Sequence, residues 1–395
     1  MTEAAVLELG ALGLDRGAHL LLKRALRELA VGERLRVTGT DPALPVHLRG
    51  WARAKGHGFE LGDDGPVLVR NGLEDGRWRG AERAGEADLD GVVERPPARW
   101  GLAARGATVE AGAPAFRFPL DDRNVVWADE AASLYAQAVA AQWDPNTAID
   151  WTLPFELPEE VEDAIVQVMT YLIENETAAL VVPARFLAQL HPHFREVMQL
   201  LAVQTADEAR HIEVFTRRAL LKRGALGLST AGGQLSLKTL VDEPDFSIAA
   251  MLLSVMGEGS FLSLLWFLHE HAPDPITRQI AKLAAQDEAR HVAFGLAHLR
   301  HHLDQDGSCR TRLANAIVRR HDELAQTAGL NEEVFDALVL LGAGSWDPDA
   351  LERGWNAVTQ LTLDMDTGRT RRLERLGFSP EEAADLSKLH TRNFM

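Results

Sequence analysis

From about residue 126 onward, apolar residues recur with the three- to four-residue spacing of amphipathic helices. Prolines and glycines interrupt the pattern at several places, so it predicts separate helices. The predicted helices cover residues 128–143, 158–190, 193–222, 246–271, 274–304, 310–327, 331–341, 348–376 and 379–391. The pattern predicts a mainly α protein, with one helical bundle over residues 126–395 and extra helices at both ends.

The first part of the chain has a different texture. Short β-like and helical stretches alternate in the order βαβαββ, which predicts a small α/β domain over residues 1–72. Residues 73–125 are rich in Gly, Ala, Arg and Pro and show no sustained periodicity. Such a composition is typical of a linker or of chain that crosses a surface.

The pentapeptide Asp-Glu-Ala-Arg-His occurs twice, at 207–211 and 287–291, each time within a predicted helix. Residues three apart on a helix share one face, so Glu208 lies beside His211 and Glu288 beside His291. One carboxylate oxygen and one imidazole nitrogen from each copy suit iron or manganese. The repeat therefore predicts a metal site with two similar halves.

Two more glutamates interrupt apolar helix faces. The stripe in 158–190 runs Ile165, Met169, Leu172, Glu176, Leu180, and the stripe in 246–271 runs Met251, Val255, Glu258, Leu262, Leu265. A carboxylate on a core-facing stripe is costly unless a charge or a metal compensates it. Glu176 and Glu258 are therefore predicted ligands, and Glu174, on a more polar face, is the weaker alternative.

The predicted ligands are Glu176, Glu208, His211, Glu258, Glu288 and His291. This pattern resembles the ferritin-like dimetal-carboxylate oxidases and oxygenases, which include ribonucleotide reductase small subunits, acyl desaturases, bacterial monooxygenase hydroxylases and arylamine N-oxygenases. The stretch Gln142–Pro145, followed by Ile149–Trp151, also resembles members of this group. The resemblance covers roughly residues 130–305. It implies a ferritin-like bundle with two Fe ions, or Mn and Fe, that activates dioxygen.

Asp207 and Asp287 precede the ligand glutamates, and a ligating imidazole usually donates its other N–H to such a carboxylate. The resemblance implies a crossed pairing, Asp207 with His291 and Asp287 with His211; the alternative is two solvated acids. Arg210 and Arg290 are expected to close ion pairs around the site.

Several other side chains remain open candidates. His298 is a candidate further ligand, and its alternative is a surface histidine. For Trp143, Trp151 and Trp266 we favour core packing over a place beside the site.

The N-terminal stretch resembles the TusA-like sulfur carriers in Leu12–Asp15, Leu20–Leu29, Asp41-Pro42 and Gly56–Gly58. That family carries its persulfide on a Cys-Pro pair, and here the corresponding residues are Asp15–Ala18. Because the stretch holds no cysteine, sulfur transfer is excluded. We interpret it as a degenerate domain for docking, oligomerisation or covering part of the main domain.

The formal net charge of −17 argues against nucleic acid or an anionic membrane as partner. Cys309 is the only cysteine, so the chain can form neither an internal disulfide nor a thiolate metal cage. No leader pattern and no apolar run approaching 18 residues is evident, so we expect a cytoplasmic protein. A homodimer is possible.

The predicted function is an O2-dependent non-haem di-iron oxidoreductase, of monooxygenase or oxidase type, with a small organic substrate and an external electron donor. The alternative is a ferroxidase or iron-handling ferritin-like protein without organic substrate. Because all six ligand positions are filled, a vestigial scaffold is disfavoured. Small residues near the first-layer glutamates would leave room beside the metals or permit close helix packing: Ala178, Ala179, Gly257, Gly259, Ser260 and Ser263.

Overall fold

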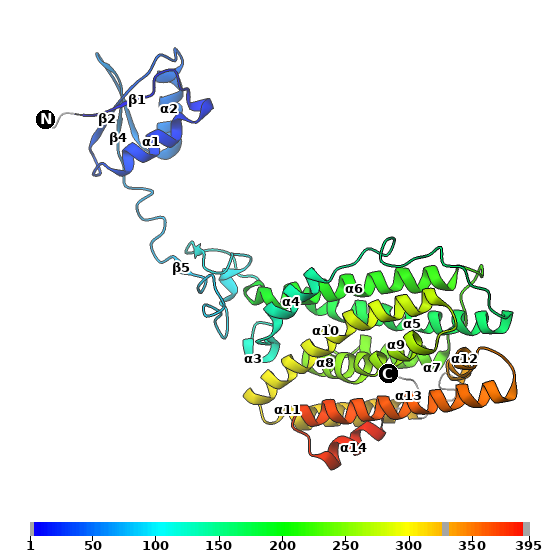
Figure 1. Cartoon of the computed structure of the whole chain (residues 1–395). Helices are drawn as coiled ribbons and strands as arrows, with labels where there is room; N and C mark the ends of the chain where they lie inside the picture. Colours follow the sequence, from blue (N-terminus) through cyan, green and yellow to red (C-terminus); the bar gives the residue numbers. More distant parts are fainter. Residues whose placement is uncertain (1–3, 326–331, 390–395) are drawn as a thin grey trace. The chain divides into compact units, whose positions relative to one another are not determined.

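The computed structural model describes residues 4–325 and 332–389. Its contacts divide the chain into two compact units, Met1–Arg83 with Thr108–Ala113, and Ala84–Ala107 with Pro114–Met395. The predicted fold class is confirmed, because a small α/β unit precedes a mainly helical one (Figure 1). The division of the chain into 1–72, 73–125 and 126–395 stays a prediction.

The first unit has the predicted βαβαββ order. Its elements are β1 (Ala5–Glu8), α1 (Ala18–Arg27), β2 (Arg34–Thr38), α2 (Leu44–Lys55), β3 (Gly58–Gly62) and β4 (Gly65–Val69). The sheet order is β1-β2-β4-β3, with β1 and β2 parallel and the other pairs antiparallel. Leu22 and Leu48 are fully buried and belong to one core with Leu35 and Leu68 of the sheet. The TusA-like relationship stays a prediction.

A short ribbon also belongs to the first unit. The strands β5 (Glu82–Arg83) and β6 (Thr108–Val109) pair antiparallel. The intervening residues 84–107 belong to the second unit, so the predicted segment 73–125 is divided between the two units. Arg105 shows how residues 84–107 are held in the second unit, because its buried guanidinium pairs with Glu196 of that unit at 2.6 Å.

The second unit is helical almost throughout. Its α-helices are α3 (Arg123–Val126), α4 (Ala131–Ala140), α5 (Glu159–Leu187), α6 (Arg195–Ala219), α7 (Ala231–Val241), α8 (Phe246–Ala250), α9 (Gly259–His271), α10 (Pro275–Gln305), α11 (Cys309–Ala325), α12 (Glu332–Ala343), α13 (Pro348–Arg375) and α14 (Pro380–Lys388). A π-helix, Met251–Glu258, joins α8 to α9. Short 3-10 turns lie at Ala98–Trp100 and Pro192–Phe194 of this unit, and another lies at Leu14–Arg16 of the first unit.

Every predicted helix has a counterpart, although residues 326, 327, 331, 390 and 391 of the predicted helices lie outside the described residues. The short α3 was not predicted, and neither was α7. The first turn of α7 contains Gly232 and Gly233, and the glycines around it were interpreted as a break. The start signal is Thr230, whose hydroxyl accepts a hydrogen bond from the Gly233 N–H and caps the helix.

The predicted helix 246–271 also differs from expectation, because its middle is π-helical. Bonding from i to i+5 widens the helix and shifts the faces that follow. Leu262 was expected on the core stripe and is only half-buried, whereas Phe261 and Leu264 are buried. A strict α-helical period could not foresee this shift.

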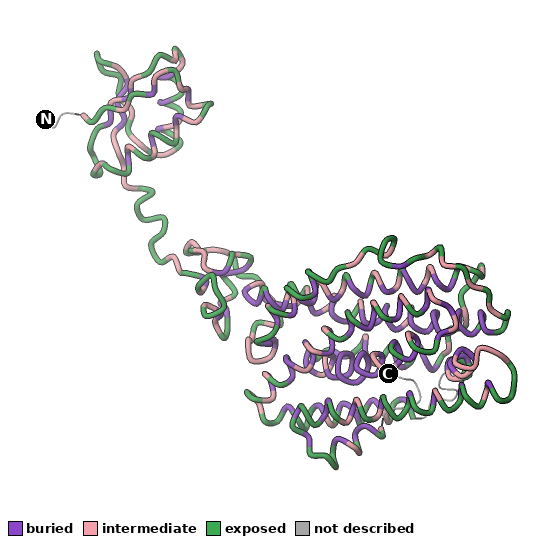
Figure 2. The backbone as a smooth tube through the Cα atoms, in the orientation of Figure 1, coloured by how far each residue is buried: buried purple, intermediate pink, exposed green. Residues whose placement is uncertain are grey.

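The core of the unit lies between the long helices, where the buried residues concentrate (Figure 2). Helices α5 and α6 pack against each other, and α10 packs against α9 and the π-helix. By length and composition, Glu159–Leu187 and Phe246–His271 could cross a membrane. Their most apolar windows are 67% and 78% buried inside the protein, so both are core helices of the bundle.

Candidate metal centre

Four glutamates and two histidines converge inside the bundle from four helical segments. Glu176 comes from α5, Glu258 from the π-helix, and the two Glu-x-x-His pairs from α6 and α10. All six side chains are buried, none exposed by more than 5%. The sequence therefore predicted correctly which side chains share this interior, and that they bind metal stays a proposal.

The cluster consists of two overlapping groups. One contains Glu176, Glu208, His211 and Glu288, and the other contains Glu208, Glu258, Glu288 and His291. Within each group one potential ligand atom per residue lies within 4.8 Å of the others. Glu208 and Glu288 belong to both groups, which is the arrangement expected of bridging carboxylates between two ions.

Several carboxylate oxygens at the centre accept no hydrogen bond within the described part of the chain, although the imidazole Nδ1 atoms lie within 3.0–3.3 Å of Glu208. Among the described residues, no hydrogen bond reaches Glu176 Oε1, either oxygen of Glu208, Glu258 Oε2 or Glu288 Oε1. Buried polar atoms without hydrogen bonds are rare and costly, and several in one place fit a cation-binding site. Four carboxylates and two neutral imidazoles also balance the charge of two divalent cations. The residues therefore fit a dimetal centre.

The pKa values of two glutamates show how closely the negative charges of the cluster are packed. Burial, reinforced by Glu208 and Glu288, raises the pKa of Glu176 well above its ordinary value. Burial and Glu288 do the same to the pKa of Glu258. Protons thus supply part of the compensation that metal ions would supply.

The two imidazoles point their other nitrogens at the predicted aspartates. His211 Nε2 lies 3.2 Å from Asp287 Oδ2, and His291 Nε2 lies 3.3 Å from Asp207 Oδ2. The crossed pairing is confirmed, and both aspartates are buried. The Nδ1 atoms face the glutamates, at 3.3 Å from His211 to Glu208 and 3.0 Å from His291 to Glu208. Each ring is therefore oriented with Nδ1 toward the candidate metals.

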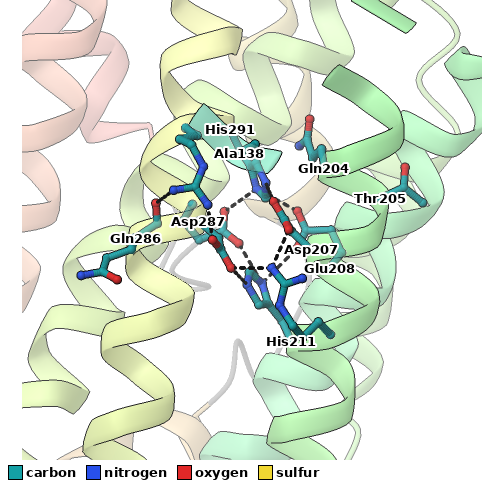
Figure 3. A network of polar contacts seen from close by, with 12 residues as sticks. Ala138, Gln204, Thr205, Asp207, Glu208, His211, Gln286, Asp287 and His291 are labelled. Atoms are coloured by element: carbon teal, nitrogen blue, oxygen red, sulfur yellow. Dashed lines mark hydrogen bonds and ion pairs between the residues drawn. The ribbon is translucent and has the colours of Figure 1, made fainter. Parts of the chain in front are cut away.

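A polar network joins the two halves behind the histidines (Figure 3). One terminal nitrogen of Arg210 contacts Asp207 at 2.5 Å and Asp287 at 2.9 Å. Arg290 also pairs with Asp287. Both arginines thus close ion pairs around the site as predicted.

Three further residues support the site. Gln142 and Gln204 were not predicted, and for Trp143 a place beside the site was the alternative to the core packing that we favoured. Gln142 Nε2 donates to Asp207 at 2.8 Å, and Trp143 Nε1 donates to Asp287 at 2.8 Å while its ring stacks on His211. Both come from the stretch Gln142–Pro145, for which a family resemblance was noted from the sequence. Gln204 Nε2 donates to Glu258 Oε1 at 3.1 Å, and it precedes Glu208 by one turn, which was an available signal.

Other candidates lie elsewhere. Glu174 is half-buried and lines a groove between α5 and α7, outside the cluster. His298 is fully buried rather than on the surface, and its ring nitrogens contact the Ser247 hydroxyl at 3.1 Å and the Trp127 carbonyl at 3.3 Å. Burial lowers the pKa of His298 to about 3. Trp266 is 40% exposed, so the core role favoured for it is wrong.

The small residues near the glutamates serve two different purposes. Ala178 lines the groove between α5 and α7, which has a volume of about 770 Å³ and includes none of the six cluster residues. Gly259 leaves space that the guanidinium of Arg372 occupies. At Gly259, the close-packing alternative is therefore the one that the structure supports.

No family model and no curated protein matches the chain. Similar solved structures include an R2-like ligand-binding oxidase with an anaerobically reconstituted Mn/Fe cofactor, a single-residue variant, with 20% identity, TM-score 0.46 and coverage of 64% of this chain and 95% of that one. The R2-like ligand-binding oxidase from Sulfolobus acidocaldarius has 18% identity, TM-score 0.44 and coverage of 64% and 93%. Similarity this remote assigns no residue role. The site stands on its own geometry: two symmetric halves, shared glutamates and supported imidazoles, within a ferritin-like arrangement of four helical segments.

Proposed function

We propose that the chain is a non-haem dimetal oxidase or oxygenase, which uses O2 to oxidise a small organic substrate. The observation that carries the proposal is a buried cluster of four glutamates and two histidines, in which several central carboxylate oxygens accept no hydrogen bond from the residues that the structure describes. Oxygen and imidazole donors favour iron or manganese, so we propose two Fe ions or an Mn/Fe pair.

The chain's own residues hold and orient this pair. Glu176 with His211 would hold one ion, Glu258 with His291 the other, and Glu208 and Glu288 both. When bound, the ions supply the redox chemistry with dioxygen.

The aspartates behind the histidines hold a proton at each Nε2. Against the effect of burial, His291 holds the pKa of Asp207 below its ordinary value, and His211 and Arg210 do so for Asp287. Ionised aspartates accept the Nε2–H and keep Nδ1 free for a metal.

The electrons for turnover must come from outside the metal pair. The only cysteine, Cys309, is buried, and the sequence shows no dinucleotide-binding fingerprint, so we propose an external donor. We propose the cytoplasm as the location.

The test is anaerobic loading with increasing Fe²⁺ per chain, followed by stopped-flow mixing with O2. An enzyme of this kind saturates at two Fe²⁺ per chain, and elemental analysis gives two tightly bound metals. Oxidation that continues to tens of Fe²⁺ per chain would establish the ferroxidase alternative. A single bound metal, or zinc alone under iron-replete conditions, would contradict the proposal.

His291→Ala and His298→Ala form a matched pair on α10. Both imidazoles are buried, but only His291 faces the cluster. We expect His291→Ala to lose metal and O2 reactivity and His298→Ala to retain two metals. Equal loss in both variants would show that general destabilisation, rather than ligation, explains the effect.

A further inference from the structure

In the π-helix that carries Glu258, one backbone N–H bonds a different carbonyl from the one it would bond in an α-helix. In an α-helix, the Gly259 N–H would bond the Val255 carbonyl, four residues back. Here it bonds the Ser254 carbonyl, five residues back. The Val255 carbonyl instead accepts a hydrogen bond from Arg372 Nε of α13, at 2.7 Å. A side chain from another helix thus replaces the α-helical donor.

The next carbonyl is also held from α13. The Met256 carbonyl accepts the Ser260 hydroxyl at 2.7 Å, and Arg369 donates from its terminal nitrogen to the same hydroxyl at 3.3 Å. Arg369 is in turn fixed by Ser387 of α14 at 3.2 Å. Arg369 and Arg372 lie one turn apart on α13. Arg372 bonds the Val255 carbonyl directly, whereas Arg369 reaches the Met256 carbonyl only through the Ser260 hydroxyl.

Gly259 makes room for this contact. A Cβ atom at Gly259 would overlap the Arg372 guanidinium. The glycine and the arginine are therefore complementary, and we expect a methyl group at residue 259 to displace the guanidinium from the Val255 carbonyl.

Arg372 has no other evident purpose in the fold. It is 9% exposed, and within residues 4–325 and 332–389 no carboxylate lies within 4.0 Å of it. Burial and the neighbouring Arg369 and Arg375 lower its pKa to about 9. A buried cation without a counter-ion is costly, so a compensating role is expected.

We propose that Arg372, supported by Arg369, is a positioning residue that holds the π-helical hydrogen-bond register of residues 251–258 and thereby places Glu258 among the ligands. Without the Arg372 donor, the Val255 carbonyl is free to take back the Gly259 N–H. The segment then tightens toward an α-helix, which rotates Glu258 out of its place. The consequence for metal binding rests on the proposed function, whereas the consequence for the backbone does not.

The experiment compares Arg372→Met and Gly259→Ala with Arg320→Met. Arg320 of α11 is a matched control, because it is 7% exposed and donates to Ser236 rather than to a carboxylate. Hydrogen–deuterium exchange of metal-free protein follows the amides of residues 251–262. Equilibrium dialysis with Fe²⁺ and near-infrared ligand-field spectra report the number and geometry of bound metals.

We expect Arg372→Met and Gly259→Ala to change hydrogen exchange at residues 251–262. We also expect both variants to bind one of the two metals roughly 10- to 100-fold more weakly. The ligand-field spectra of these two variants should change in the same way. Arg320→Met should lose thermal stability but still bind two metals and keep an unchanged spectrum. The inference is overturned if Arg372→Met keeps the exchange pattern of the intact protein. It is also overturned if exchange changes but both metals and the spectrum stay as they were. If the intact protein binds no metal, the proposed function fails. The hydrogen-exchange comparison then still tests whether Arg372 holds the π-helical hydrogen-bond register.

Discussion

Glu176 and Glu174 lie two residues apart on α5, and only Glu176 belongs to the metal cluster. Glu176 is 3% exposed and has an oxygen without a hydrogen-bond partner, whereas Glu174 is half-buried and lines a groove. We therefore expect Glu176→Ala to abolish tight binding of one metal and Glu174→Ala to retain both. Elemental analysis after dialysis measures this. Loss of metal in Glu174→Ala but not in Glu176→Ala would mean that the face of α5 that carries Glu174 lies at the metal site.

Asp287 gathers more donors than any ligand. It accepts from Trp143 at 2.8 Å and from Arg210 at 2.9 Å, and it faces His211 Nε2. In Asp287→Asn the size is kept but the charge that fixes the imidazole is lost, so metal affinity should fall by roughly 10- to 100-fold. Competitive titration with a chelator measures the change. Asp242→Asn, on an exposed carboxylate, is the control, and an equal loss there would contradict the assignment.

At this scale the sequence was informative where one residue breaks a periodic pattern. Glu176 and Glu258 interrupt apolar stripes, and the two Glu-x-x-His repeats identify the rest. Gln142 and Trp143 lie outside the predicted ligand helices, so no spacing connects them to Asp207 and Asp287. The burial of His298 was also hidden, because its neighbours His301 and His302 suggest a polar surface.

At the scale of elements, helix existence follows from local periodicity, but the π-helix does not. Its register depends on Arg372, more than a hundred residues away, which takes the Val255 carbonyl. The start of α7 depends on the Thr230 cap, which outweighs two helix-disfavouring glycines. Where the periodic pattern is ambiguous, hydrogen-bond donors from distant residues and helix caps determine the type of helix and where it begins.

Arg218 ties three helices together inside the bundle. Its fully buried guanidinium makes two hydrogen bonds to Glu162 of α5, at 2.6 and 3.0 Å, and two to Asp274, the cap of α10, at 2.9 and 3.3 Å. Arg218→Met leaves two buried carboxylates unpaired, which costs about 3–5 kcal/mol. Urea unfolding of the variant should show this loss in the free energy of unfolding.

Lys238→Met is the control for this loss. It removes an exposed pair with Asp242, which contributes about 0–1 kcal/mol. Comparable losses in the two variants would mean that the Arg218 network carries little of the stability.

At the scale of the whole molecule, the change in sequence texture predicted an α/β part and a helical part, which the structure confirms. The path between them was not predictable. Residues 84–107 belong to the helical unit, partly through Arg105 and Glu196, and residues 108–113 return to the first unit. Contacts between residues about ninety positions apart leave no local pattern in a stretch rich in Gly and Pro.

Removal of residues 1–72 tests how far the metal site depends on the first unit. All six cluster residues, their aspartates and the supporting Gln142, Trp143, Gln204 and Arg210 belong to the second unit. We therefore expect the shortened chain to bind two metals and to keep the ligand-field spectrum of the full chain, because no contact described at the cluster is lost. Dialysis, elemental analysis and thermal unfolding of both chains measure this. Loss of one metal with an intact helical transition would mean that the N-terminal unit completes the site. Retained metals with slower O2-dependent turnover would assign that unit to docking of the external electron donor.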